Sequence, residues 1–259
     1  MPFAKAGDLR VHYLFAGAAG APVLALSNSL GADLSMWEPQ MLELKKRFRL
    51  LQYDTRGHGR TSVTDGPCTI EQLAGDVLRL LDALGIGRAH FCGLSMGGKI
   101  GMWLGAHAPE RIEKLVLCNT AARIGTAEAW NARIKSVQDL GMKGIAAAVT
   151  ERWFTAGFRE RSPGLVATAQ AMLERTPPEG YVACCAAIRD SDQGAGLGGI
   201  RAPSLVIAGR HDPATTPADG RALAEGIAGA RYVELEAAHL SNIEAAPQFT
   251  AELTAFLTA

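Results

Sequence analysis

The chain has 259 residues, 48% of them apolar, which is enough to bury a sizeable core in one large domain or two small ones. Its 26 basic and 26 acidic residues cancel, which argues against nucleic acid as the main partner, because binding phosphates needs clustered positive charge. The sequence has no long apolar run, no signal-peptide core at residues 1–5 and five scattered cysteines without a CxxC pair, which together predict a soluble cytoplasmic protein.

Short runs rich in Val, Leu and Ile predict the strands of a sheet. They cover residues 9–16, 23–26, 49–53, 90–92, 115–118, 205–208 and 232–235. Helical signals separate them: Thr69 and Gln72 form a capping-box pattern before an apolar face that ends at Gly85. Pro217 and Pro247 each open a later helix. This alternation predicts an α/β fold with a mostly parallel central sheet flanked by helices.

Residues 121–199 interrupt the alternation, because they contain no convincing strand. Their pattern predicts helices over 126–140, 142–153, 163–174 and 179–188, followed by a flexible glycine-rich return. We interpret residues 121–199 as a helical cap inserted into a core formed by residues 1–120 and 200–259.

The sharpest chemical signal is the Gly-Leu-Ser-Met-Gly segment at residues 93–97. It follows a predicted buried strand and opens a predicted helix, which is the context of a nucleophile elbow. Ser95 would sit in a strained turn, with glycines where side chains would come too close. A glycine-rich helix start with a capping serine is the weaker interpretation.

A serine hydroxyl needs a base that is held in place by an acid, and here the chain order should be Ser, acid, His. Asp212 directly follows a late strand, whereas Asn119 lacks a carboxylate and Asp190 and Asp192 follow no strand. His239 follows the last strand. The other histidines fail on order or position: His12, His58, His90, His107 and His211. No grouping has metal-ligand spacing on one element, so we expect no metal.

An oxyanion would need two backbone donors aimed at one point. The N–H of Met96, next to the nucleophile, is one candidate. The loop after the strand at 23–26 should supply the other, and we assign it to the N–H of Leu30.

The segments at 27–37, 53–59, 92–98 and 239–244 resemble the α/β-hydrolase family and, within it, the 3-oxoadipate enol-lactonases of bacterial protocatechuate and catechol breakdown. The resemblance covers essentially the whole chain. The Ser-Asn-Ser-Leu-Gly loop at 27–31 and the His-Leu-Ser-Asn segment at 239–242 are its more particular parts. The family's triad falls on Ser95, Asp212 and His239. Lys99 departs from the expected small or apolar residue, and we expect its side chain to reach solvent.

The resemblance implies cofactor-free hydrolysis of a small enol-lactone that carries a carboxymethyl group. A carboxylate enclosed by a cap must be paired, and arginine offers bidentate geometry. Arg133 lies on a helical face with Trp130, so we expect Arg133 to bind the carboxylate, with Trp130 and Trp153 as an apolar wall. The alternative that Arg133 only covers apolar surface remains open.

The elbow and triad also fit a carboxylesterase, a perhydrolase or a carbon–carbon bond hydrolase. A ligand-sensing binding protein built on a hydrolase scaffold is a further alternative from another class. Enzymes that need a carboxylate nucleophile, such as haloalkane dehalogenases and epoxide hydrolases, are disfavoured because position 95 is serine. The sequence does not indicate an oligomeric state.

Overall fold

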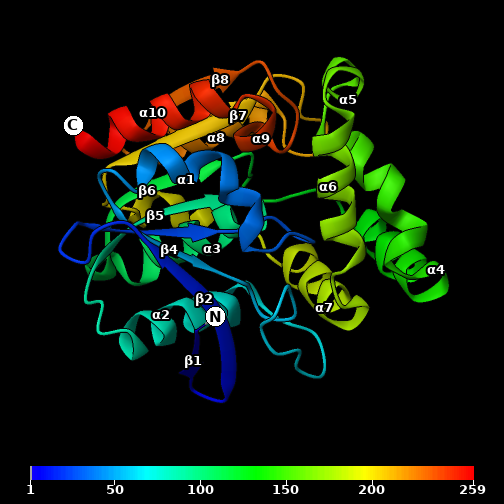
Figure 1. The fold of residues 1–259 in the computed structure, drawn as a ribbon, viewed down its shortest axis with the longest axis horizontal. Coiled ribbons are helices and arrows are strands. Elements are labelled where there is room, and N and C mark those ends of the chain that lie inside the picture. The colour runs from blue at the N-terminus through cyan, green and yellow to red at the C-terminus, as the bar shows by residue number, and fades with distance from the viewer. Residues whose placement is uncertain (1) are drawn as a thin grey trace.

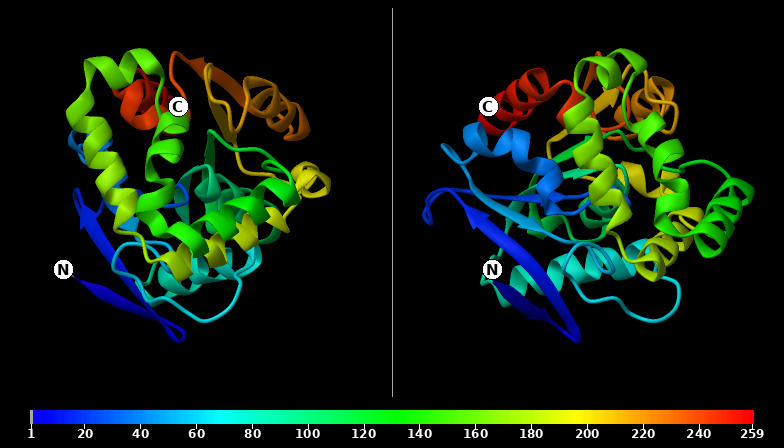
Figure 2. Two further views of the ribbon diagram at one scale, coloured as in Figure 1. Left: turned by 90° about the vertical axis from the view of Figure 1, so that its right-hand side faces the viewer. Right: turned by 45° about the vertical axis from the view of Figure 1, so that its right-hand side comes forward.

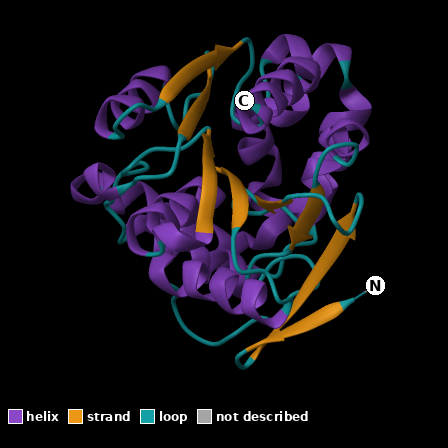
Figure 3. Cartoon of the chain, turned by 90° about the vertical axis from the view of Figure 1, so that its left-hand side faces the viewer, coloured by secondary structure: helices purple, strands orange, loops and turns teal. Residues whose placement is uncertain are grey.

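One twisted sheet of eight strands runs through the molecule (Figures 1 and 3). The computed structural model describes residues 2–259, so Met1, the first residue of the segment inspected for a signal peptide, lies outside the described residues. The strands are β1 (Phe3–Ala6), β2 (Leu9–Ala16), β3 (Val23–Ser27), β4 (Arg49–Tyr53), β5 (Ala89–Leu94), β6 (Ile112–Cys118), β7 (Ser204–Gly209) and β8 (Arg231–Leu235).

The strand order is β1-β2-β4-β3-β5-β6-β7-β8. β1 pairs with β2, and β2 with β4, in antiparallel fashion, and all other neighbours are parallel. The predicted mostly parallel sheet is therefore confirmed. Strands β5 and β7 are buried along their whole length, as continuous apolar runs require when helices cover both faces. β1 was not predicted from the sequence.

Helices cover both faces of the sheet. They are α1 (Glu38–Leu44), α2 (Ile70–Ala83), α3 (Met96–His107), α8 (Pro217–Gly226) and α10 (Ala246–Thr258), with the short α9 (Ser241–Glu244) before the last. α1 packs against α10 above the sheet in Figure 1, while α2 packs against α3 and lies below it. The predicted cap of α2 is present, since Thr69 Oγ1 accepts from Gln72 N at 3.0 Å, and Gly85 follows the helix with φ 67°. None of the helices within residues 2–259 is long and apolar enough to cross a bilayer.

Four helices lie between β6 and β7. They are α4 (Ala127–Trp153), α5 (Ala156–Arg161), α6 (Pro163–Glu174) and α7 (Pro178–Arg189). They form a layer beside the carboxyl ends of the strands (Figure 2). α4 is kinked at Gly141, which has φ 67° and ψ −179°, so the two helices expected around that residue meet there. The glycine-rich return forms a 3-10 helix, η3 (Gly194–Gly199), rather than an irregular segment.

The helical layer meets the sheet at a contact between two glycines. A Cβ on Gly180 of α7 would fall 2.1 Å from the carbonyl oxygen of Gly57, which follows β4. A Cβ on Gly57 would fall 2.5 Å from the Cα of Gly180, and Gly57 has φ 71°. Only glycine fits at either position, because the two backbones touch.

Candidate active site

The functional loops gather at one edge because the parallel strands end in register. Ser27 pairs with Gly93, Leu94 with Cys118, and Cys118 with Ile207. The residues that follow β3, β5, β6 and β7 therefore come together beyond the carboxyl ends of the strands. This edge is where open α/β sheets bind ligands.

Ser95 occupies the turn between β5 and α3, with φ 58° and ψ −111°. Positive φ is strained for a non-glycine residue, and such strain gathers at functional sites. A Cβ on Gly93 would lie 2.1 Å from the carbonyl oxygen of Gly97, and one on Gly97 would lie 2.2 Å from that of Ser27. The glycines on each side of the serine are thus required by close backbone contact, as the elbow interpretation expects.

His239 and Asp212 form a buried pair. His239 Nδ1 lies 2.7 Å from Asp212 Oδ2, which leaves Nε2 of the ring for another partner. Both carboxylate oxygens are held: Oδ1 accepts from the N–H groups of Ala214 and Thr215 at 2.8 and 3.1 Å, and Oδ2 accepts from Thr215 Oγ1 at 2.7 Å. Burial raises the pKa of Asp212, but His239 and these hydrogen bonds outweigh it, so the net pKa is lowered and the group stays ionised.

Asn119, which sequence reasoning considered only as a failed acid, positions both members of this pair. It follows β6 with φ 44°, and its Nδ2 donates to Asp212 Oδ2 at 3.0 Å and to Ala238 O at 3.1 Å. Its Oδ1 accepts from the hydroxyl of Ser241 at 2.5 Å. The signal for this role was its place after a strand, since a side chain there faces the catalytic edge.

The oxyanion loop, residues 28–31, lies against the elbow, because Gly97 N donates to Asn28 O at 3.0 Å. Neither Leu30 N nor Met96 N donates to another residue within 2–259, which leaves both free for a ligand. Gly31 N donates to His58 Nε2 at 2.9 Å, and His58 Nδ1 lies 3.1 Å from the carbonyl oxygen of Arg56. His58, fully buried, therefore holds the loop in its neutral form.

A cavity of about 250 Å³ joins these groups to the helical layer. Ser95, His239 and Leu30 line its floor, and α4 supplies Trp130, Arg133, Arg152 and Trp153, all four of which line it. The structure thus brings together every side chain that the sequence placed in the site. Arg152 and the buried Tyr181 of α7 also line the cavity and were not predicted, because helical spacing alone does not reveal which face meets a cavity.

Hydrogen bonds connect the helical layer directly to the loop that contains His239. Leu240 N donates to the carbonyl oxygen of Trp153 at 3.0 Å. Glu244 Oε2 accepts from Ala238 N at 2.9 Å and from Thr155 N at 3.2 Å. The position of His239 therefore depends on the end of α4.

The expectation that Lys99 reaches solvent is wrong. Its side chain is fully buried, and Nζ donates to Ala122 O at 2.7 Å and to Ser191 O at 3.3 Å. These carbonyls belong to the two segments that connect the sheet to the helical layer. Burial lowers the pKa of Lys99 to about 8, and the carboxylate of Asp192 opposes this.

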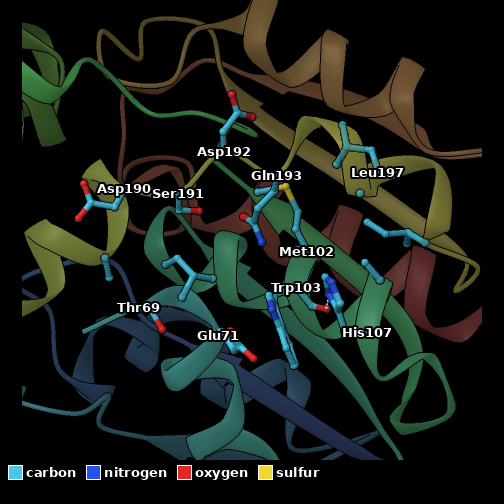
Figure 4. A pocket seen from close by; sticks show the side chains of 15 residues that line it. Thr69, Glu71, Met102, Trp103, His107, Asp190, Ser191, Asp192, Gln193 and Leu197 are labelled. Carbon is cyan, nitrogen blue, oxygen red and sulfur yellow. Dashed lines mark hydrogen bonds between the residues drawn. The ribbon is translucent and has the colours of Figure 1, made fainter. Parts of the chain in front are cut away.

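A larger cavity, of about 380 Å³, lies at the far end of α3 (Figure 4). Trp103 and His107 stack on its wall, with ring centroids 4.6 Å apart. None of the sequence-predicted site residues lines it, so size alone does not identify the catalytic cavity. Within residues 2–259, no group of three or more His, Cys, Asp or Glu side chains could hold a metal ion.

Comparison with known proteins shows the fold family of the chain and relatives along nearly its whole length. Residues 22–156 match the family described as alpha/beta hydrolase fold. The chain is 46% identical over 239 residues to 3-oxoadipate enol-lactonase 2 of Acinetobacter baylyi, covering 92% of this chain and 90% of the relative. It is 39% identical over 241 residues to 3-oxoadipate enol-lactonase 1 of the same organism, covering 93% and 90%. The crystal structure of the enol-lactonase from Burkholderia xenovorans LB400 superposes over 100% of both chains, with a TM-score of 0.98 and 52% identity.

Proposed function

Since this chain belongs to the alpha/beta hydrolase family, we propose that it hydrolyses 3-oxoadipate enol-lactone to 3-oxoadipate in the breakdown of protocatechuate or catechol. The observation that carries the reaction type is the hydrogen bond between His239 and Asp212, because His239 lines the same cavity as Ser95. The substrate comes from the relatives, which are 46% and 39% identical over more than nine-tenths of this chain.

The reaction proceeds in two halves. Ser95 Oγ attacks the lactone carbonyl while His239 Nε2 takes its proton, and the N–H groups of Leu30 and Met96 receive the oxyanion. Collapse breaks the ring C–O bond. The leaving group is a stabilised enolate, which takes the proton from His239 and then tautomerises to the ketone, so His239 is neutral again for the second half.

The second half releases the acid. Water gives a proton to His239 and attacks the acyl carbonyl, and the acyl–oxygen bond to Ser95 breaks, with the proton returning to the serine. Asp212 holds the ring of His239 in one tautomer throughout. Every atom exchanged comes from substrate or water, so the proposal requires no cofactor.

Residues 121–199 act as the cap in this proposal, and residues 1–120 and 200–259 as the catalytic core. β6 ends at Cys118 and β7 begins at Ser204, and the helices between them supply the outer wall of the cavity. A cytoplasmic location is part of the same proposal, because five scattered cysteines suit a reducing compartment.

Arg133 supplies the positive charge for the carboxymethyl group. It lines the cavity, and its guanidinium lies 5.2 Å from the ring centroid of Trp130. No carboxylate within residues 2–259 pairs with it. Replacing it (Arg133→Ala) is expected to lower kcat/KM for the lactone roughly tenfold to a hundredfold, the range for a hydrogen bond to a charged group. An unchanged kcat/KM would show that Arg133 does not bind the substrate's carboxylate.

The deciding experiment follows the loss of enol-lactone absorbance with purified wild-type protein, with a neutral aryl ester measured in parallel. The proposal expects rapid multiple turnover of the lactone, well above that of the ester. Ser95→Ala is the control and should lose roughly 10⁴-fold or more in kcat. Ester turnover without lactone turnover would leave a carboxylesterase, and one slow turnover that ends in a stable adduct would favour a ligand sensor.

A further inference from the structure

The Tyr181 hydroxyl is buried at the cavity, and its hydrogen meets no acceptor among residues 2–259. The side chain lies on α7, is 0% exposed, and lines the cavity that contains Ser95 and His239. No residue within 2–259 makes a hydrogen bond of regular geometry with its Oη. Buried polar groups are nearly always paired, so an unpaired hydroxyl beside a cavity is placed to donate to a bound ligand.

The neighbour of this hydroxyl is Arg133. A guanidinium can only donate hydrogen bonds, so Tyr181 can offer Arg133 its oxygen but not its hydrogen. Burial raises the pKa of Tyr181 and the charge of Arg133 opposes this, so the phenol remains protonated near neutral pH. The O–H hydrogen therefore lacks an acceptor, and a ligand that supplies one beside a guanidinium would be an anion.

The indole N–H of Trp130, another polar group on this side of the cavity, already has a hydrogen-bond partner. Trp130 Nε1 donates to the carbonyl oxygen of Ile124 at 2.6 Å. The indole therefore contributes an apolar face and no free donor. Tyr181 and Arg133 can therefore meet a carboxylate together at this place in the cavity, which Arg152 also lines.

We propose that the Tyr181 hydroxyl and the Arg133 guanidinium bind the substrate's carboxylate together, which makes Tyr181 a specificity-determining residue. The inference rests on the proposed function for the identity of the substrate. An anionic oxygen between the two groups receives one hydrogen bond from each. A neutral carboxamide offers the hydroxyl only an uncharged carbonyl oxygen, which accepts a weaker hydrogen bond, so the pair favours lactones that carry a carboxylate.

Tyr181 also fixes the distance between the two ends of the substrate. A Cβ on Gly31 would fall 3.0 Å from Tyr181 Cε2, so the ring packs on the backbone of the oxyanion loop. Leu30, the proposed oxyanion donor, is the preceding residue. The carboxylate pair and the oxyanion donor therefore share one rigid support, held from behind by His58.

The test is Tyr181→Phe, measured with the enol-lactone and with its neutral carboxamide. Loss of one hydrogen bond to the carboxylate should raise KM for the acid roughly tenfold to a hundredfold and leave its kcat within about twofold. KM for the carboxamide should rise much less, because the hydrogen bond to its neutral carbonyl oxygen contributes less. Equal effects on both substrates, or no effect on either, would overturn the inference.

Tyr53→Phe is the matched control. Tyr53 is also a buried tyrosine, but its hydroxyl bonds to Ser27 Oγ at 2.6 Å and the residue does not line the cavity. Any loss of stability or activity in this variant should affect acid and amide alike. A preference for the amide in Tyr53→Phe as well would show that the effect is not local to Tyr181, and the inference would fail.

The two proposals can fail separately. If wild-type protein does not open the enol-lactone, the proposed function fails, and the monoaryl esters of succinic acid and of succinamic acid replace the substrate pair. A much larger rise in KM for the succinic acid ester than for the succinamic acid ester in Tyr181→Phe would still support the carboxylate pair. The same KM shift for both esters would reject it.

Discussion

His58 shows how a single buried residue sets the shape of the oxyanion loop. It accepts from Gly31 N, which requires a neutral ring, and burial lowers its pKa below the ordinary value of 6.5. The unfolded chain therefore takes up a proton near pH 6.5 that the folded protein resists. Stability from this residue is complete above pH 6.5 and is lost as the pH falls below it.

We therefore expect the free energy of unfolding of the wild type to fall more steeply from pH 7.5 to pH 5 than that of His58→Gln. Urea unfolding at several pH values measures it. Burial also lowers the pKa of His90, but that residue is present in both proteins and cancels in the difference. Parallel curves for the two proteins would contradict the assignment.

In the proposed mechanism, Asp212 holds the ring of His239 rather than exchanging protons itself. Asp212→Asn would keep the shape of the side chain but present a neutral amide to His239. We expect kcat to fall about 10³–10⁴-fold, as for other triads that lose the charge of their acid. Asp190→Asn, at the exposed end of α7, is the control and should retain activity. If kcat fell by a similar factor in both variants, the assignment of Asp212 as the acid would be wrong.

At the level of residues, the placement of Ser95, Asp212 and His239 at one edge of the sheet could be predicted, because chain order and strand ends restrict the candidates. The roles of Asn119 and Tyr181 could not. Asn119 positions Asp212 across 93 residues of sequence, and Tyr181 gains its meaning only where α7 meets Arg133 of α4. Such relations depend on tertiary contacts that no local pattern contains.

At the scale of elements, Lys99 joins α3 to both segments that connect the sheet and the helical layer. Because its folded pKa is about 8 against 10.5 for the free side chain, the folded protein releases this proton more readily than the unfolded chain. Its contribution to stability therefore rises as the pH increases from 8 towards 10.5.

Lys99→Met tests this link. Between pH 7.5 and 10, the free energy of unfolding of the wild type should increase relative to the variant by about 2 kcal/mol. Urea unfolding of both proteins at each pH gives the difference, which cancels the tyrosines and cysteines that also titrate in this range. A difference that stays constant with pH would contradict the buried-ammonium assignment.

The predicted elements were most accurate where the apolar pattern was long. β3 to β8 and the helices α2 and α3 were all expected, because continuous or periodic apolar runs define them. β1 was missed because Phe3–Ala6 is a short edge strand whose residues are only partly buried. α5 was missed because Ala156–Arg161 buries only Phe158 and carries two arginines in its last turn.

For the whole molecule, the buried apolar residues of the sheet and of the helical layer form one continuous cluster. The proposed core and cap should therefore unfold as a single cooperative unit. Two tryptophans, Trp37 and Trp103, belong to the core, and two, Trp130 and Trp153, belong to the cap.

Cooperative unfolding can be tested with four variants, each of which keeps one tryptophan and has phenylalanine at the other three positions. Thermal unfolding followed by fluorescence should report the same midpoint for a core and a cap tryptophan in proteins of matched stability, as judged by circular dichroism. A cap tryptophan that changes well before the circular dichroism signal would show that residues 121–199 melt on their own.

The contact between Gly57 and Gly180 restricts which substitutions this protein can accept during evolution. A side chain at either position separates the helical layer from the sheet, and no substitution at the other glycine can make room, because glycine is already the smallest residue. No single substitution at Gly57 or Gly180 is therefore tolerated, and a second substitution cannot rescue the first. A chimera that takes its helical layer from a related protein must have glycine at the position of Gly180. Otherwise the helical layer cannot pack against the sheet.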